Sequence, residues 1–225
     1  MNVPTAHMCQ APADVAGAGS HRGGDVLALL FSRSSVAPKT LDTPGPSAEE
    51  LMQMVSAAMA APDHEGLRPW RFILIEGPGR LQLSQAFAQI RKKANPRLSS
   101  QELARSWRKT MRAPTLIGVA ARLVRDHPKV PLHEQYVSIG AAIYGLMLAC
   151  HALGYGAMVL SGKRARDSLV HSLLELCADE EMIGFISMGT PTKPIQPKTR
   201  PLPSEYLRVW RGTDGARQHG SRLIR

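Results

Sequence analysis

The sequence predicts a single domain built as a sheet flanked by helices, and three observations lead to this expectation. The chain has 225 residues, 44% of them hydrophobic and 20% charged, which suits one globular domain with a sizeable core. Segments with helical apolar spacing alternate with short apolar segments typical of buried strands. No internal repeat is visible along the chain. Interleaved helices and strands of this kind pack as layers around one core.

Helix signals are clearest in the first half of the chain. Asp25 can cap a short helix. Ser47 and Glu50 form a capping box, because Ser47 can accept from the amide of Glu50 while Glu50 reaches back. Apolar residues at helical spacing follow: Leu51, Met54, Val55, Ala58 and Met59. Pro62 ends this helix because it disfavours the α conformation of the residue before it.

Apolar spacing, capping residues and turn residues also predict the remaining strands and helices. The expected strands cover residues 70–76, 115–121, 157–160 and 182–188, and Gly77-Pro78-Gly79 closes the first. The expected helices lie around residues 81–90, from a second capping box at Ser99 and Glu102 to Trp107, from Leu132 to about 153, and around 169–176.

One surface of the longest expected helix consists of unusually small residues: Gly140, Ala141, Ala142 and Gly145. Small residues let another group approach the helix backbone closely. That group is either a neighbouring helix of the same chain, or a partner subunit or flat cofactor, and the sequence leaves both open.

The two ends of the chain differ from its middle in composition. Residues 1–24 are rich in Ala, Gly and Pro, and residues 213–225 carry Gly, Arg and polar side chains, so we expect a disordered extension and a basic disordered tail. The domain then covers residues 25–212.

Composition also limits the location of the protein. No apolar run approaches the roughly 20 residues that span a bilayer, and no secretory signal is recognisable. Cys9, Cys150 and Cys177 are odd in number and widely spaced, which argues against a disulfide framework or a metal site and favours the cytoplasm. We expect Cys150 and Cys177 to be small core residues.

The net charge of +10 comes largely from one region. A solvated pair of helices is the preferred interpretation, although a basic surface can also steer anions or bind nucleic acid. Only Trp107 could stack on bases there, which argues against single-strand binding. The basic residues are Arg91, Lys92, Lys93, Arg97, Arg105, Arg108, Lys109 and Arg112.

The usual catalytic motifs are missing from the sequence. There is no G-x-S-x-G, H-E-x-x-H, Walker loop or G-x-G-x-x-G, and the histidines lack the paired spacing of metal ligands. A flavin enzyme needs none of these, since the isoalloxazine itself accepts and gives hydride. We therefore expect no catalytic side chain and no metal, with the chemistry carried by a cofactor.

Three segments are suited to hold such a cofactor. Arg33, Ser34 and Ser35 stand at a helix end and can clamp a phosphate with a guanidinium and two hydroxyls. The loop 62–69 joins a helix to a strand. The third segment is 154–162, whose glycines permit close approach of a ligand to the backbone.

In this order and spacing, the segments resemble the nitroreductase family, above all its compact YdjA-like branch of NAD(P)H nitroreductases. The resemblance covers residues 25–203. It rests on LLFSRSS at 29–35, MAAPDH at 59–64, RPWRF at 68–72, RAP at 112–114, HPKVP at 127–131, EQ at 134–135, GYG at 154–156, SG at 161–162, GF at 184–185 and GTP at 189–191.

The resemblance implies an α+β homodimer with a mainly antiparallel sheet. Each dimer would bind two FMN molecules tightly but non-covalently, and each FMN would touch both subunits. Arg33, Ser34 and Ser35 would hold its phosphate and ribityl end. Ala60 and His64 would line it from the other chain, and Val159, Leu160 and Ser161 would contact it through backbone and hydroxyl. NAD(P)H, the co-substrate, would stack over the ring near Gly154.

The implied function is ping-pong transfer of hydride from NAD(P)H through FMN to a nitroaromatic, quinone or similar small acceptor. Two alternatives stay open: flavin-fragmenting or dehalogenating chemistry on the same fold, and a non-enzymatic basic nucleic-acid binder. The chain departs from its branch at Val159-Leu160-Ser161, where the branch has Trp-Arg-Ser. It also has Gly66 and Arg68 where the broader family places Asn and Gln.

Overall fold

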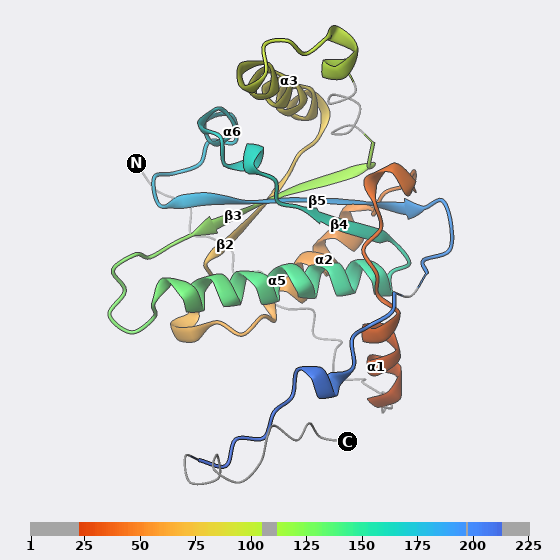
Figure 1. Cartoon of the computed structure of the whole chain (residues 1–225), viewed down its shortest axis with the longest axis vertical. Coiled ribbons are helices and arrows are strands. Elements are labelled where there is room, and N and C mark those ends of the chain that lie inside the picture. The colour runs from red at the N-terminus through yellow and green to blue at the C-terminus, as the bar shows by residue number, and fades with distance from the viewer. Residues whose placement is uncertain (1–22, 105–111, 197, 213–225) are drawn as a thin grey trace, which may run out of the picture. The chain divides into compact units, whose positions relative to one another are not determined.

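The structure is a computed structural model that describes residues 23–104, 112–196 and 198–212. The chain divides into two units, one ending at Ile195 and one beginning at Gln196. The first unit contains the sheet and all the α-helices described below (Figure 1). The second contains one short 3-10 helix, η5 (Pro203–Glu205), and the exposed side chain of Trp210.

The sheet has five strands and every pairing in it is antiparallel. The strands are β1 (Leu41–Asp42), β2 (Trp70–Leu74), β3 (Thr115–Arg122), β4 (Gly156–Leu160) and β5 (Glu180–Pro191). Their order is β1-β5-β3-β2, and β4 pairs with β5. The four predicted strands and the mainly antiparallel sheet are confirmed, whereas the two-residue β1 was not predicted because it is too short to show a period.

Helices cover both faces of this sheet (Figure 1). On one face lie α2 (Ala48–Met59) and α5 (Leu132–Ala152), and on the other α3 (Gly77–Ala94) and α6 (Ser168–Leu173). The helix α1 (Gly23–Ser32) contacts α5. Short 3-10 helices are η2 (Pro38–Thr40), η3 (His64–Gly66) and η4 (Lys163–Arg166).

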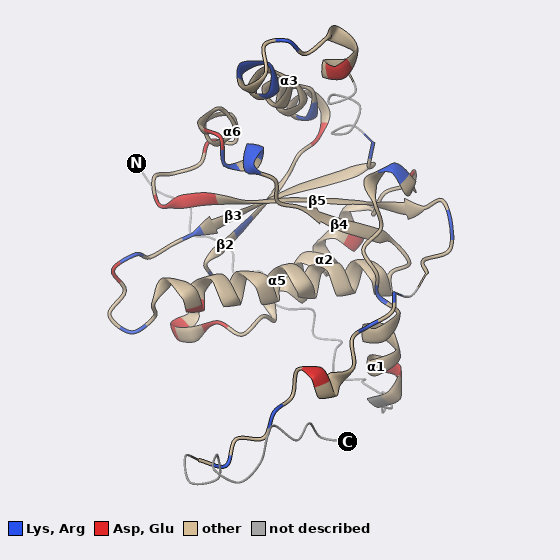
Figure 2. Cartoon of the chain, viewed as in Figure 1, with Lys and Arg blue, Asp and Glu red and all other residues tan. Residues whose placement is uncertain are grey.

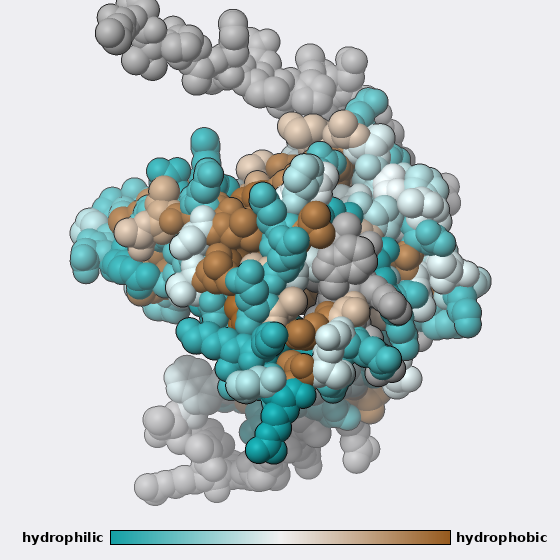
Figure 3. Space-filling view, turned by 90° about the horizontal axis from the view of Figure 1, so that it is seen from above, coloured by the Kyte–Doolittle hydropathy of each residue, from teal (hydrophilic) through white to brown (hydrophobic). Residues whose placement is uncertain are grey.

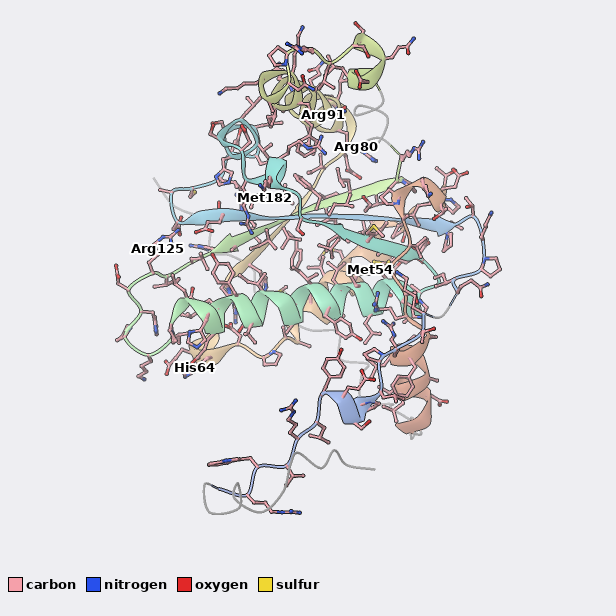
Figure 4. The ribbon with its side chains drawn as sticks, viewed as in Figure 1. Met54, His64, Arg80, Arg91, Arg125 and Met182 are labelled. Carbon is pink, nitrogen blue, oxygen red and sulfur yellow. The ribbon has the colours of Figure 1, made fainter. Side chains whose placement is uncertain are left out.

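The two faces of the sheet have separate apolar cores. Met54 lies fully buried between the sheet and the α2–α5 pair, and Met182 lies in the core on the α3–α6 side (Figure 4). The strand β3 is buried along seven of its eight residues. Burial on both faces explains why its sequence is a continuous apolar run rather than an alternating one.

Both predicted capping boxes are present. The amide of Glu50 donates to Ser47 Oγ at 3.1 Å, and Glu50 Oε2 accepts from the amide of Ser47 at 2.8 Å. Ser99 and Glu102 form the same reciprocal pair. The helix they open is described only as far as Ala104, and Arg105, Trp107, Arg108 and Lys109 lie outside the described residues.

Two expectations about local structure are wrong. The first helix begins at Gly23, so Asp25 lies inside it and is not its cap. The first predicted strand does end before Gly77, and Gly77 and Pro78 open α3, because proline suits the first helical turn, where no amide partner is needed. Cys177 is exposed. Cys150 is buried as expected, and burial raises the pKa of its thiol to about 12.

The small residues of α5 serve different neighbours. A Cβ on Gly145 would meet the carbonyl oxygen of Ala57 in α2 at 2.9 Å, so this glycine permits close packing within the chain. A Cβ on Gly140 would meet nothing within 4 Å. Intrachain packing therefore accounts for one end of the small surface, and the Gly140 end faces outward.

Two absences apply to the described residues alone. None of the helices there is long and apolar enough to cross a membrane. No group of three or more His, Cys, Asp or Glu side chains among them could hold a metal ion. Residues 1–22, which include Cys9, and residues 213–225 lie outside the described part, so the boundaries of the terminal segments stay predictions.

Candidate cofactor site

The segment after α1 lies against the outer edge of β4. The amide of Val36 donates to the carbonyl of Ala157 at 2.9 Å. A Cβ on Gly156 would meet Val36 Cβ at 2.9 Å, so glycine at this position permits the close approach of the two segments. Because β5 occupies the other edge of β4, the segment that follows residues 33–35 lies at the free edge of β4.

Ser34 has a buried hydroxyl that forms no hydrogen bond with the described residues. Its side chain is 5% exposed, and its Oγ has no hydrogen-bond partner there. Buried hydroxyls are normally hydrogen-bonded, and leaving one unsatisfied costs roughly 1–3 kcal/mol. A ligand oxygen at this position would satisfy it.

Positive charge gathers beside Ser34. The Arg33 guanidinium lies 5.8 Å from the centre of the Tyr144 ring, which fixes it against α5. Ser32 Oγ lies 2.9 Å from Nε2 of His151, which belongs to α5 like Tyr144. Burial, and then the charge of Arg33, lower the pKa of His151 from 6.5. An arginine followed by a serine whose buried hydroxyl is unsatisfied has the chemistry of a phosphate-binding segment.

The far end of β4 opens onto a cavity of about 500 Å³. Val159, Leu160 and Ser161, the three residues of this segment predicted to contact a flavin, all line it, and their contact with a flavin stays a prediction. The carbonyl of Ala157 points to the outer edge, and alternate residues of a strand direct their backbone groups to the same side. The amide and carbonyl of Val159 therefore also face that edge. Other lining residues are Phe87, Leu116, Gly162, Arg164, Ala165, Phe185 and Ser187.

Ala60 and His64 belong to a different part of the unit. Ala60 is the C-cap of α2, and His64 opens η3 in the loop that follows. His64 Nδ1 lies 2.8 Å from Glu134 Oε2 at the start of α5 (Figure 4). The amide of Arg68 donates to Asp63 Oδ2 at 2.6 Å, and Glu65 and Arg68 have positive φ angles of 61° and 49°. The Asp63 carboxylate thus braces a loop with strained backbone.

Within one chain, two of the three predicted segments come together and the third does not. Val36, which follows residues 33–35, contacts Ala157 of β4, the strand that leads to residues 159–161. Ser32 contacts α5 at His151, whereas His64 contacts it at Glu134. These two positions are about 25 Å apart along the helix axis.

Sequence reasoning missed several residues of this region. Glu134 was part of the motif at 134–135 but had no assigned role, because its partner lies 70 positions away. Phe87 and Arg164 line the cavity from α3 and η4. The basic run Lys163-Arg164-Ala165-Arg166 directly after Gly162 was the available signal for Arg164.

Known proteins resemble the chain over most of its length. A family model described as the nitroreductase family matches residues 30–190. The Escherichia coli K12 protein named "Putative NAD(P)H nitroreductase YdjA" is 34% identical over 167 residues, which cover 74% of this chain and 88% of that protein.

Solved structures share the fold. A nitroreductase-like protein from Bacillus cereus superimposes with a TM-score of 0.68 at 21% identity, covering 83% of this chain and 96% of that one. Iodotyrosine deiodinase bound to FMN and 3-iodo-L-tyrosine gives a TM-score of 0.61 at 21% identity, covering 84% and 99%. The family model matches well over half of the chain, and the arrangement of strands and helices agrees with it. This chain therefore belongs to the nitroreductase family.

Proposed function

We propose that this protein is an FMN-dependent oxidoreductase that takes hydride from NAD(P)H and reduces an electron-poor small molecule such as a nitroaromatic or a quinone. Two comparisons support this proposal: its relative in Escherichia coli is named as an NAD(P)H nitroreductase, and a structural neighbour is bound to FMN. When bound, FMN supplies the hydride transfer, in separate half-reactions with donor and acceptor.

The single observation that carries this proposal is the buried hydroxyl of Ser34. It lacks a hydrogen-bond partner among the described residues, and it directly follows Arg33 in the chain. Arg33 would bind the FMN phosphate with charge-assisted hydrogen bonds, and the hydroxyls of Ser34 and Ser35 would donate hydrogen bonds to it. On binding, the FMN phosphate exchanges its hydrogen bonds with water for hydrogen bonds with these side chains. How well the side chains match the phosphate therefore decides how tightly the protein retains FMN.

The outer edge of β4 would position the rest of the cofactor. Val159 offers an amide donor and a carbonyl acceptor on that edge, a pair that suits the polar edge of a flavin ring. Ser161 adds a hydroxyl at the mouth of the cavity. Held at this edge, a ring leaves a face free for donor and acceptor in turn, which supplies the proximity that catalysis needs.

His64 supports a proposal of two chains per site. It lies about 25 Å along α5 from the phosphate end, so it would reach a cofactor from a second copy. We propose a homodimer in which Ala60 and His64 of one chain line the FMN held by residues 33–35 and 159–161 of the other.

Exposed apolar side chains support the same assembly. On α5 Val137 is 70% exposed and Tyr144 44%, and on α1 Phe31 is 67% exposed. Together with the outward-facing Gly140, they make an apolar surface on helices that contact each other. Exposed apolar surfaces of this kind mark sites of protein–protein contact.

The proposed activity is tested by the visible spectrum of the purified protein before and after anaerobic addition of NADPH or NADH. We expect a yellow protein whose flavin absorbance is bleached by at least one nucleotide and restored by a nitroaromatic. A colourless protein that takes up no added FMN would refute the proposal.

The proposed dimer is tested by solution mass. We expect the mass of two chains for the wild type and of one chain for Val137→Glu, with FMN lost alongside the dimer. Lys39→Glu, at an exposed position of η2, is the matched surface control. A monomer that keeps stoichiometric FMN would contradict a shared site.

A further inference from the structure

The cavity at the end of β4 has a lining suited to a ring with a charged substituent. Most of its lining side chains are apolar, and Phe87 and Phe185 form an edge-to-face aromatic pair with centroids 5.6 Å apart. Two hydroxyls, of Ser161 and Ser187, interrupt this lining. The volume of about 500 Å³ lies within the range of small-molecule sites.

Among the described residues, the cation that lines the cavity is Arg164. Arg164 projects from η4, and its guanidinium carbon lies 5.8 Å from the centre of the Phe87 ring. Among the described residues it forms no ion pair with a carboxylate. Contact with the aromatic ring holds the guanidinium in place without neutralising its charge.

The surroundings of Arg164 strengthen the positive potential. Arg91 of α3 is close enough for its charge to oppose that of Arg164. Lys163 and Arg166 flank Arg164 in η4, and Arg91, Lys92 and Lys93 form the last turn of α3 (Figure 2). Figure 3, which views the molecule from this side, shows apolar side chains gathered among hydrophilic ones. An apolar cavity with a cationic rim favours an amphiphilic anion.

We propose that Arg164 is a specificity-determining residue and that the cavity selects aromatic acceptors bearing a carboxylate or other anionic group. This rests on the proposed function, because Val159, Leu160 and Ser161 both line the cavity and would contact the flavin. The aromatic ring packs against the apolar lining, and the anion pairs with the guanidinium.

For a nitroaromatic carboxylate, the first reduction balances simply. NAD(P)H gives up two electrons and one proton as hydride, and solvent gives a second proton. One N–O bond of the nitro group breaks, and the products are the nitroso compound, water and NAD(P)⁺. The carboxylate is unchanged and serves only for recognition.

The experiment compares two acceptors that differ in charge and little in shape: 4-nitrobenzoate and 4-nitrobenzamide. We measure kcat/KM for both with the FMN-loaded enzyme and with Arg164→Gln, Arg164→Lys and Lys163→Gln. Lys163 neighbours Arg164 in η4 but does not line the cavity, so it is the matched control for a lost surface charge. FMN content and circular dichroism establish that each variant is folded and loaded.

We expect the wild type to prefer 4-nitrobenzoate. Arg164→Gln should lower kcat/KM for 4-nitrobenzoate by roughly tenfold or more, as for a lost charge-assisted hydrogen bond, and that for 4-nitrobenzamide by less than about twofold. Arg164→Lys should retain part of the preference, and Lys163→Gln nearly all of it. Equal losses for both acceptors, or equal effects of Lys163→Gln, would overturn the proposal. Release of FMN by Arg164→Gln without a change of preference would also overturn it and assign the guanidinium to the cofactor.

The same measurements distinguish failure of the proposed function from failure of the proposed anion selectivity. If neither acceptor is reduced with NADPH or NADH, the activity is wrong, and titration calorimetry with 4-nitrobenzoate then tests the cavity alone. Binding to the wild type that Arg164→Gln weakens and Lys163→Gln does not would still support an anion-selective cavity. Equal affinity for the amide would overturn it.

Discussion

The His64 imidazole is held by the Glu134 carboxylate, with Nδ1 and Oε2 2.8 Å apart. If Nδ1 donates to the carboxylate, Nε2 is left to face a ligand, so Glu134 sets which ring nitrogen is available. Both side chains are about half exposed, and this pair can therefore orient the ring more than it stabilises the fold. Its value would lie in positioning His64 for the cofactor of a partner subunit.

Glu134→Gln should weaken FMN binding by a few fold without lowering the thermal stability of the FMN-free protein measurably. The reason is that an exposed pair contributes only about 0–1 kcal/mol to folding, whereas a misoriented imidazole loses its contact with the ligand. Fluorescence titration gives the FMN dissociation constant. Lys129→Gln, which removes the neighbouring Lys129–Glu65 pair, is the control that should leave this constant unchanged. Equal constants for Glu134→Gln and the wild type would refute the role.

Ser34→Ala should have opposite effects on folding and on binding. In the FMN-free protein the Ser34 hydroxyl is buried without a partner among the described residues, so its removal should leave stability unchanged or raise it by up to about 1 kcal/mol. FMN affinity should fall by roughly tenfold, since a hydrogen bond to the phosphate is lost. Thermal unfolding of the FMN-free protein and FMN titration measure the two effects. A destabilised variant with unchanged FMN affinity would mean that Ser34 is structural.

The two glycines of α5, Gly140 and Gly145, should respond differently to alanine. Gly145→Ala places a Cβ 2.9 Å from the Ala57 carbonyl oxygen, and separating α2 from α5 should cost about 1–3 kcal/mol in the free energy of unfolding. Gly140→Ala meets nothing within the chain and should stabilise the monomer by up to about 1 kcal/mol through helix propensity. Urea denaturation tests both. A neutral Gly145→Ala would contradict the tight helix contact.

Local chemistry explains how far the sequence could predict this structure. The Ser47–Glu50 box and the buried run of β3 are encoded within a few neighbouring residues, so they were predictable. The His64–Glu134 contact joins residues 70 positions apart, and no local pattern encodes it. Val159, Leu160 and Ser161 were placed by resemblance, and they do line one cavity. Arg164 was hidden because a basic run is usually only solvated, and its contact with Phe87 depends on how α3 packs.

Arg71 should stabilise the fold by neutralising Glu180. The Glu180 side chain is 5% exposed, Arg71 Nη2 lies 2.6 Å from its Oε2, and the amide of Cys177 donates to the same oxygen at 3.0 Å. Arg71→Met leaves a buried carboxylate without its cation and should lower the free energy of unfolding by about 3 kcal/mol. In a double variant with Glu180→Gln, part of this loss should return. Denaturant titrations of the single and double variants measure it, and additive losses would contradict the pairing.

His151 should make the FMN-free protein less stable as the pH falls. Burial and the charge of Arg33 lower the pKa of its imidazole from 6.5, so the folded chain resists protonation more than the unfolded chain does. Between the two pKa values the unfolded chain binds the extra proton, and stability therefore rises with pH. This contribution is complete above pH 6.5 and is lost as the pH falls through the lower, folded-state pKa.

The test compares urea denaturation from pH 8 to pH 5 for the wild type, His151→Gln and His133→Gln. All three proteins lose stability as their carboxylates titrate, so the informative quantity is the difference between the curves. We expect a shallower loss below pH 6.5 for His151→Gln, because glutamine cannot be protonated there. His133 is exposed on α5, and its variant should follow the wild type. Parallel curves for the wild type and His151→Gln would show that Arg33 and burial impose no penalty on the His151 imidazolium.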